Sequence, residues 1–382
     1  MLLEGLKVIE LASWVAGPGC AAMMADWGAD VVKVESAAGD PMRTLYPDTA
    51  EQPGNPVFAL ENRGKRGVVL DIARADGREA LLALLRTADV FITNLRPGSL
   101  RRSGLDYDTV KHEAPRLIYS SITGYGLEGP DADLPAFDIT GFWSKSGIAA
   151  TTIPPDQEPF PCRPGFGDHA TALATLAAIL AAVHERAQTG RGRLVETSLL
   201  RTGTYALGWD LAVQLRYGAA VGAVPRDDRM EPISGYFRTR DARWICMVPR
   251  GPACFAAVMA MIGHELVDNP RYALPIADLD AAREVRALVD AAFVEMTMDE
   301  AAAALSAADV IWAPMATLAE VAAAPQAISA GCFAEISDGW GGRMRTPAAP
   351  ARFPEGAPAL TRAAPRLGEH TAEVLRQAGI AD

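Results

Sequence analysis

Short apolar runs alternate with helical patterns over the first third of the chain. Lys7–Leu11 is an apolar run that leads into a Gly/Pro-rich turn, and the residues after it predict a helix from Cys20 to Trp27. Val31–Glu35 is a second apolar run. Three more strand-like runs follow at 67–71, 89–93 and 117–122, with a helix expected at 76–87. Strands that alternate with helices in this way predict an α/β fold with an open, mostly parallel sheet covered on both faces.

The pattern becomes irregular beyond the fifth run. Residues 127–166 are rich in proline and loop residues, and so long a connection is usually a functional cover. The strongest helix pattern of the chain follows at 169–186 and ends before Gly190. Asp168 directly precedes this helix and is expected to cap it.

A second, smaller domain is expected at 217–313. It begins with a polar connector, continues with a hairpin-like region at 233–248 and contains helices between about 254 and 307. The remaining residues, 314–382, are expected to end in a helix near Thr371–Gln377.

The composition is that of an ordinary soluble globular protein, with 49% hydrophobic and 22% charged residues. The net charge of −11 disfavours a broad surface for nucleic acid or anionic membrane, so an anionic ligand needs a local basic pocket. The five cysteines have no metal-like spacing, which favours a reduced, cytoplasmic protein. No export signal is expected, and the longest nearly apolar run, 170–183, is too short to predict a membrane span.

Three basic segments stand out because the chain as a whole is acidic. They contain Arg43, then Arg63, Lys65 and Arg66, and then Arg96, Arg101 and Arg102. Since the second and third adjoin predicted strands, their loops could share one sheet edge and bind a ligand with several phosphates. Solvated surface arginines are the alternative interpretation.

The turn at 17–22 fits the dinucleotide fingerprint G-x-G-x-x-A, and Glu35 lies near the position of a ribose-binding carboxylate. A tight turn at a helix start favours a phosphate, although Pro18 removes one of the amides that the turn would offer. Nicotinamide binding and a purely structural turn both remain possible here.

Asp168 follows Gly165-Phe166-Gly167 and has two interpretations. As a helix cap it would accept backbone N–H bonds and stay ionised at the positive helix end. As a nucleophile it would attack an acyl group, with neighbouring amides holding the developing oxyanion. His169 and His184 are candidates for a proton carrier or for metal ligands, but their spacing does not fit an i, i+4 metal pair and no acidic cluster accompanies them. Surface or interface histidines with satisfied partners are the simpler interpretation.

A set of ordered motifs resembles the class III CoA-transferase family, whose superfamily includes alpha-methylacyl-CoA racemase. The motifs are Ala16-Gly-Pro18, Val32-Lys-Val-Glu35 with Gly39-Asp-Pro-x-Arg43, Asn62-x-x-Lys-Arg66, Asn94-Leu-Arg-Pro-Gly98, Gly124-Tyr-Gly-x-x-Gly-Pro130, Gly167-Asp168, Thr189-Gly-Arg-Gly192 and Leu367-Gly-Glu-His-Thr371. The resemblance implies a Rossmann-like large domain made of 1–216 and 314–382, a smaller α+β domain, and a homodimer of interlocked rings.

The resemblance also implies a chemistry and a site. Asp168 would attack an acyl-CoA thioester to give a mixed anhydride, and the CoA thiolate would convert the anhydride into an aspartyl-CoA thioester for a second acid. No metal and no cofactor beyond CoA, as substrate and carrier, is implied. The positions assigned to the CoA site are Ala16, Arg43, Lys65, Asn94, Leu95, Arg102 and Tyr125.

Three departures from relatives refine this expectation. Val15 replaces a polar glutamine and Ser36 replaces an arginine of the formyl-CoA enzyme, which argues against oxalate as a substrate. Phe137-Asp138 stands where the racemase has a His-Asp pair, so transfer is favoured over exchange of an α-proton. The residues around Phe137 resemble relatives that act on aryl or branched hydroxy acids. Racemisation, nicotinamide-dependent oxidoreduction and non-catalytic CoA binding are the alternatives.

Overall fold

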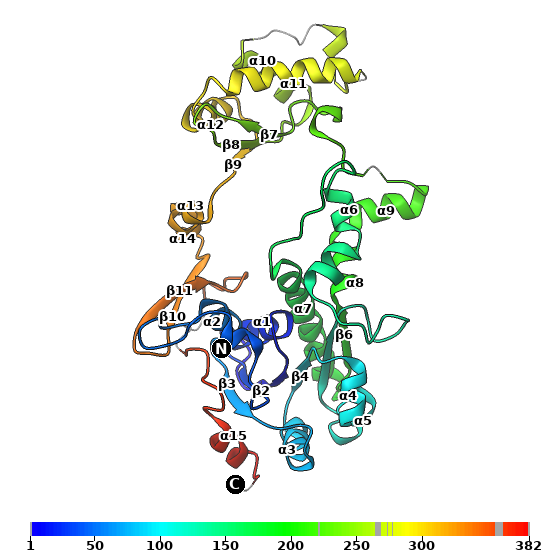
Figure 1. The fold of residues 1–382 in the computed structure, drawn as a ribbon, viewed down its shortest axis with the longest axis vertical. Coiled ribbons are helices and arrows are strands. Elements are labelled where there is room, and N and C mark those ends of the chain that lie inside the picture. Colours follow the sequence, from blue (N-terminus) through cyan, green and yellow to red (C-terminus); the bar gives the residue numbers. More distant parts are fainter. Residues whose placement is uncertain are drawn as a thin grey trace. The chain divides into compact units, whose positions relative to one another are not determined.

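The computed structural model describes residues 2–220, 222–263, 269–272, 274–276, 278–355 and 362–380. The chain forms two compact units (Figure 1). The larger unit comprises 1–153, 157–221 and 328–382, and the smaller one comprises 154–156 and 222–327. The chain enters the main part of the smaller unit at Gly222, close to residue 217, where the sequence pattern changes.

A six-stranded, wholly parallel sheet forms the centre of the larger unit, with strand order β3-β2-β1-β4-β5-β6. The strands are β1 (Lys7–Leu11), β2 (Asp30–Glu35), β3 (Arg66–Val69), β4 (Val90–Thr93), β5 (Ile118–Thr123) and β6 (Leu194–Ser198). This sheet confirms the predicted α/β class, and β6 is a strand that the sequence analysis did not predict.

Helices cover both faces of the sheet (Figure 1). Val8 and Ile9 of β1 point to opposite faces, as the two-residue period of a strand requires. Helices α1 and α7 pack on the Val8 face, and α3, α4, α5 and α15 pack on the Ile9 face. The unit contains α1 (Ala16–Asp26), α2 (Pro56–Asn62), α3 (Ala75–Arg86), α4 (Pro97–Ser103), α5 (Tyr107–Glu113), α6 (Ile148–Thr152), α7 (Phe166–Thr189), α8 (Leu199–Ala206), α9 (Gly208–Tyr217) and α15 (Thr371–Gln377).

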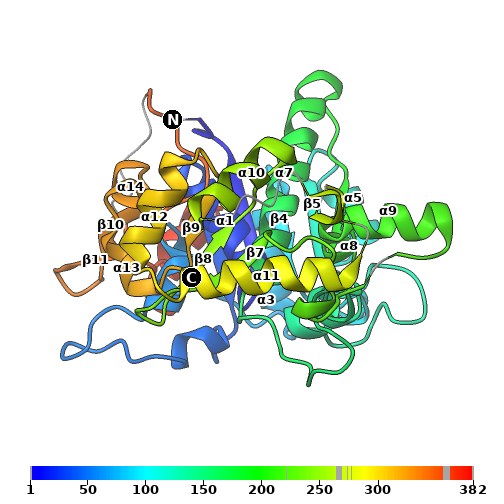
Figure 2. The same cartoon turned by 90° about the horizontal axis from the view of Figure 1, so that it is seen from above.

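Helix α7 lies beside α1 (Figures 1 and 2) and contributes Leu176 and Ile179 to the core. Among the described residues it is the one helix long and apolar enough to cross a membrane by length and composition alone. Its packing against α1 and the sheet accounts for the apolar residues on its buried face.

Asp168 does not cap α7, which corrects the expectation from the sequence. Gly165 is the N-cap, with a φ of +82°, and the helix begins at Phe166, so Asp168 lies inside the first turn. The loop-rich segment before it contains a π-helical turn, Ile139–Ser144, as well as α6.

The segment after residue 362 completes the larger unit along β3, the edge strand. The backbone N–H of His370 donates to the carbonyl of Gly67 at 2.9 Å, and the N–H of Val69 donates to Thr371 Oγ1 at 3.1 Å. Helix α15 has the predicted bounds, and an antiparallel pair, β10 (Phe333–Ser337) and β11 (Arg343–Pro347), precedes it.

The smaller unit has a three-stranded antiparallel sheet and its own apolar core. The predicted hairpin is present as β7 and β8, and a later strand, β9, joins β8. The elements are β7 (Gly235–Arg238), β8 (Trp244–Met247), β9 (Trp312–Pro314), α10 (Gly251–Met261), α11 (Leu279–Phe293), α12 (Met298–Ala307) and α13 (Leu318–Ala323), while α14 (Pro325–Ser329) crosses the boundary between the units.

Candidate active site

A cavity of about 350 Å³ lies where the strand order reverses between β1 and β4. Ser13 and Trp14 follow β1, Asn94 and Leu95 follow β4, and all four line it. Loops at the C-terminal ends of parallel strands leave a crevice at such a reversal, which is the usual ligand position in open α/β sheets. Helix α7 brings Asp168 to the same cavity.

Two glycines explain why the first turn of α7, which carries Asp168, lies at this cavity. Gly165 adopts a positive φ that a side chain would strain. A Cβ on Gly167 would lie 2.5 Å from Cγ of Phe142, so only glycine lets the first turn approach that ring. The Gly-Phe-Gly sequence therefore fixes the position of the carboxylate.

The pKa of Asp168 is raised to about 7, first by burial and then by the negative charge of Asp138. His169 acts in the opposite direction, and Glu61 adds to the increase. The positive end of α7 favours the carboxylate, but desolvation outweighs it. No hydrogen bond to the Asp168 carboxylate is present among the described residues. A cavity-lining carboxylate whose pKa is perturbed in this way is a candidate functional group.

Aromatic side chains form one wall of the cavity. Trp14 and Phe137 both line it and meet edge to face, with ring centroids 5.3 Å apart. Trp14 has a φ of +67°, which is strained for a tryptophan. Its backbone N–H donates to Asp40 Oδ1 at 3.3 Å, and this hydrogen bond stabilises the strained turn.

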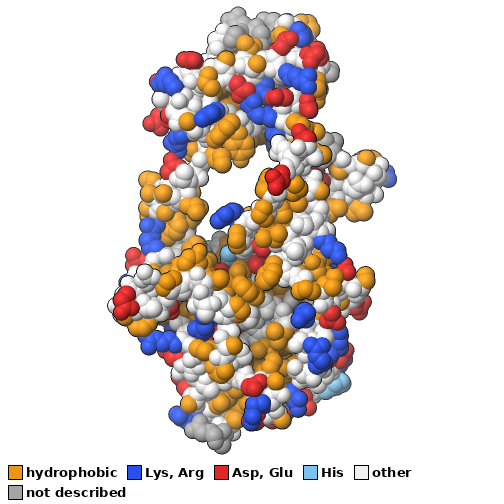
Figure 3. All heavy atoms as spheres, viewed as in Figure 1, with side chains coloured by type: hydrophobic (Ala, Val, Ile, Leu, Met, Phe, Trp, Pro, Cys, Tyr) orange, Lys and Arg blue, Asp and Glu red, His pale blue; other side chains and the backbone are white. Residues whose placement is uncertain are grey.

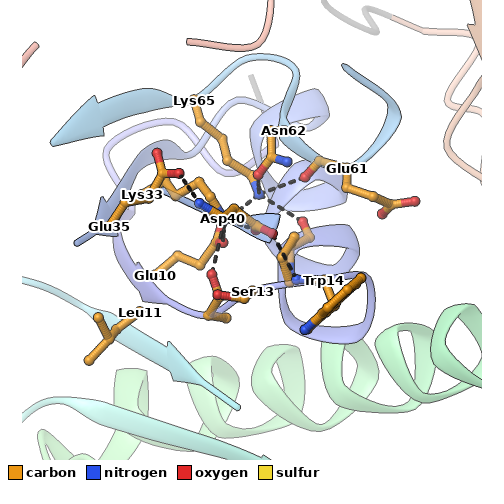
Figure 4. Close-up of polar contacts among 12 residues, drawn as sticks. Glu10, Leu11, Ser13, Trp14, Lys33, Glu35, Asp40, Glu61, Asn62 and Lys65 are labelled. Atoms are coloured by element: carbon orange, nitrogen blue, oxygen red, sulfur yellow. Dashed lines mark hydrogen bonds and ion pairs between the residues drawn. The ribbon is translucent and has the colours of Figure 1, made fainter. Parts of the chain in front are cut away.

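That support belongs to a buried ion-pair cluster of Glu10, Lys33, Asp40 and Lys65 (Figure 4). Lys33 Nζ lies 2.8 Å from Glu10 Oε1 and 2.9 Å from Asp40 Oδ2. Lys65 Nζ lies 2.5 Å from Glu10 Oε2, and all four side chains are fully buried. Each ammonium also donates to backbone carbonyls, so the charges are compensated by several partners at once.

The structure divides the predicted site residues into two groups. Asp168 lines the cavity together with Ala16, Asn94 and Leu95. The other four predicted positions do not line it: Arg43, Lys65, Arg102 and Tyr125.

Lys65 is enclosed in the core, which argues against the predicted contact with CoA. Four hydrogen bonds occupy its ammonium, and burial lowers its pKa to about 8, opposed chiefly by Glu10. Arg43 is bound to Glu35 at 2.6 Å and stacks 4.1 Å from the centroid of Phe58. Because Arg43 and the N–H of Asp40 occupy Glu35, this carboxylate does not stand free for the ribose of a dinucleotide.

The basic segment at 63–66 is likewise structural, which corrects the expected phosphate loop. Arg63 pairs with Asp26, Lys65 with Glu10, and Arg66 with Asp30 and Glu373. The third segment differs, because Arg96 lines the cavity and Arg102 is exposed on α4, and neither has an ion pair within the described part of the chain.

Asn94 lines the cavity but uses its amide for the protein itself. Its Nδ2 donates to the carbonyl of Ser13 at 2.7 Å, and its Oδ1 accepts from the N–H of Ser13 at 3.0 Å. These two hydrogen bonds join the loop after β1 to the loop after β4, at the position where the strand order reverses. Tyr125 lies outside the cavity beneath Lys145, whose Nζ is 4.7 Å from the ring centroid.

The sequence analysis missed two features of this region. The Trp14–Phe137 wall joins residues 123 positions apart, and Trp14 has a positive φ there. His169 Nε2 lies 2.8 Å from Glu61 Oε1, which raises the pKa of the histidine. The adjacency of His169 to Asp168 was visible in the sequence, but its acidic partner was not.

The comparisons with known proteins support CoA transfer among the alternatives. The family described as CoA-transferase family III matches residues 3–371 of this chain. The chain belongs to CoA-transferase family III. This membership confirms the resemblance found in the motifs and identifies the protein as an enzyme that transfers CoA.

Relatives of family III match over nearly the whole chain. A (R)-2-hydroxy-4-methylpentanoate CoA-transferase of Clostridioides difficile is 34% identical, covering 99% of this chain and 96% of its own. A cinnamoyl-CoA:phenyllactate CoA-transferase of Clostridium sporogenes is 32% identical, covering 99% and 93%. The crystal structure of a CAIB/BAIF family protein from Brucella suis aligns with a TM-score of 0.86 at 31% identity, covering 98% of this chain and 99% of that one.

Proposed function

We propose that this family III enzyme moves CoA from an acyl-CoA to a second carboxylic acid, with Asp168 as the covalent nucleophile. One observation carries the proposal: Asp168 lies on the wall of the strand-reversal cavity, with a pKa near 7 and no hydrogen-bond partner among the described residues. At neutral pH a large fraction of such a group is ionised and not quenched by strong partners.

The proposed reaction proceeds in four steps. The Asp168 carboxylate attacks the thioester carbonyl, the C–S bond breaks, and CoA leaves as thiolate from a mixed anhydride. The thiolate attacks the aspartyl carbonyl and releases the first acid. The carboxylate of the second acid attacks the carbonyl of this aspartyl-CoA thioester, the C–S bond breaks, and CoA leaves as thiolate from a new mixed anhydride. The thiolate then attacks the acyl carbon of that anhydride, which releases the new acyl-CoA and restores the carboxylate.

Backbone dipoles are the groups best suited to stabilise the oxyanions. Helices α1 and α7 both start at the cavity, through Ala16 and Asp168. First-turn amides have no acceptor within their helix and carry the positive end of its dipole. Removing one such donor from an oxyanion typically slows a reaction by about 10²–10³-fold.

The acyl group is inferred to be a 2-hydroxy acid with an apolar aryl or branched substituent. Trp14, Phe137 and Leu199 make a hydrophobic wall, and the two relatives above are named for such acids. We further propose a cytoplasmic homodimer of interlocked rings, as the family resemblance implies, with CoA as the sole carrier.

Oxygen labelling tests the nucleophile directly. After a single turnover with an acyl-CoA and an ¹⁸O-carboxylate acceptor, one labelled oxygen is expected in Asp168, because the bridging oxygen of the second anhydride stays with the aspartate. Mass spectrometry of the peptide that contains Asp168 measures it. Hydroxylamine added with acyl-CoA alone should convert the same residue into a hydroxamate.

Asp168→Asn should abolish transfer and labelling. Glu128→Gln is the matched control, since Glu128 is an exposed acid of the nearby loop that does not line the cavity, and it should label as the native enzyme does. Full transfer without oxygen in Asp168 would exclude the proposed covalent route.

A further inference from the structure

The smaller unit contains a cavity of about 570 Å³ that no step of the proposed transfer uses. Its size lies within the range of small-molecule pockets, roughly 300–1,000 Å³. Three arginines line it, Arg226, Arg229 and Arg286, and none of its lining residues is acidic. A positive cavity is unusual here, since the chain has a net charge of −11.

The three guanidinium groups differ in how many of their N–H groups have a hydrogen-bond or ion-pair partner. Arg226 makes a bidentate pair with Asp290, with both N···O distances at 2.7 Å. Arg286 is only 3% exposed; its Nη2 donates to the carbonyl of Arg229 at 2.7 Å, while its Nη1 is buried and has no partner among the described residues. Arg229 is exposed and makes no ion pair within the described part of the smaller unit.

A buried guanidinium with an unused N–H group costs free energy unless a ligand or water accepts from it. Burial lowers the pKa of Arg286, and the charge of Arg226 adds to the effect. An anion in the cavity would oppose both effects, because a nearby negative charge favours the charged form of the guanidinium. The geometry is that of a receptor for an oxyanion, since planar guanidinium groups bind carboxylates and phosphates through paired N–H donors.

Aromatic side chains form the other part of the lining. Tyr236 on β7 pairs with Cys246, two residues from Trp244 on β8, so Tyr236 and Trp244 stand on the same face of the hairpin. They are 51% and 40% exposed, which leaves their rings available to a ligand. Basic and hydrophobic side chains adjoin each other on the visible face of this unit (Figure 3).

We propose that this cavity is a second ligand site that binds a small oxyanion carried on a planar ring, with Arg229 and Arg286 on the oxyanion and Tyr236 and Trp244 against the ring. A ring carboxylate and a nucleotide phosphate share this chemistry. The site is separate from the Asp168 cavity in its lining residues, so it does not depend on the proposed transfer mechanism.

The test uses the full chain labelled with 5-fluorotryptophan, in which the ¹⁹F signal of Trp244 is assigned by Trp244→Phe. Six compounds are titrated: 3-phenylpropanoate, 3-phenylpropanol, 3-cyclohexylpropanoate, adenosine 5′-monophosphate, adenosine and inorganic phosphate. A saturable shift with the phenyl carboxylate or with the monophosphate, at least about tenfold weaker for the uncharged partner of each pair, is the expected result. Which of the two binds more tightly identifies the source of the oxyanion.

Arg229→Gln should weaken binding about fivefold to tenfold, because it removes a charged donor at an exposed position. Arg240→Gln is the matched control, as an exposed arginine of the same unit that is paired with Glu300 and does not line the cavity. Arg286→Met tests the buried donor, with thermal unfolding to verify the fold. Equal shifts from charged and uncharged compounds, unchanged binding in Arg229→Gln, or a Trp244 signal that follows protein concentration alone would each overturn the proposal.

Discussion

The larger unit holds two groups of carboxylates that meet opposite electrostatic conditions. Glu10 and Asp40 each accept from a fully buried ammonium and have no exposed side-chain surface. Asp168 and Asp138 lie close enough to raise the pKa of Asp168, and Oδ2 of Asp138 is buried with no hydrogen-bond partner among the described residues. The first group supports the backbone of the strained Trp14 turn, whereas in the second group burial and the charge of Asp138 raise the pKa of Asp168.

The largest expected effect comes from breaking the first group. Lys33→Met should lower the free energy of unfolding by about 3–5 kcal/mol, because it leaves Glu10 and Asp40 as buried charges with one ammonium fewer. Urea unfolding followed by tryptophan fluorescence measures it. Arg74→Met, which removes an exposed pair with Asp76, should change stability by less than about 1 kcal/mol. A similar loss of unfolding free energy in both variants would show that the buried ion pairs contribute no more to stability than an exposed pair.

Asp168→Asn should raise the free energy of unfolding, whereas Lys33→Met lowers it. The folded-state pKa of about 7 lies above the ordinary 3.8, so ionisation of Asp168 destabilises the fold increasingly as pH rises from about 4 to 7. The variant should therefore be more stable than the native protein at pH 8, by about 2 kcal/mol once partial solvent contact is allowed for, and equal to it near pH 4. Unfolding curves at both values measure this, and a loss of stability at pH 8 would contradict the assigned desolvation.

Arg102 provides a comparison between free and paired surface cations. Arg102→Gln should raise the KM for acyl-CoA about fivefold at low salt, since the guanidinium is exposed and has no ion pair among the described residues. Arg101→Gln removes a guanidinium that Asp133 already neutralises and should change KM less. Steady-state kinetics at two salt concentrations measure both, and a larger effect from Arg101→Gln would place the ligand elsewhere.

The smallest expected effect concerns the His169–Glu61 pair. His169 lowers the pKa of Asp168 and Glu61 raises it. His169→Gln should therefore move the rising limb of the pH–rate profile to higher pH, and Glu61→Gln should move it to lower pH, each by about half a unit. Single-turnover rates of acyl transfer to Asp168 between pH 5 and 9 measure the shifts. Shifts of equal sign would rule out direct electrostatic action.

The local pattern of apolar residues was enough to predict five of the six strands of the parallel sheet, but not the ion pairs between charged residues far apart in the sequence. Buried parallel strands read as continuous apolar runs, which is why five of them could be recognised. Strand β6 escaped because its Glu196 is exposed and interrupts the run. Lys65 looked like a ligand residue because its partner Glu10 lies 55 positions away, and only the tertiary structure brings the two together.

The candidate site was predicted to a similar extent. The ordered motifs led to Asp168, Ala16, Asn94 and Leu95, which do meet at one cavity. The assignment of Asp168 as a helix cap was wrong, because Gly165 is the N-cap and the first turn of the helix packs against Phe142 through Gly167. Such a contact depends on a side chain 25 positions away and leaves no local pattern.

The hydrogen bonds between Gly67 and His370 join residues that are 303 positions apart. On the ribosome, β3 therefore emerges long before the segment that protects its open edge. An uncovered edge strand invites pairing with other chains, so newly made protein is exposed to aggregation until translation reaches that segment. Premature termination before residue 362 should consequently yield insoluble product rather than a smaller working enzyme.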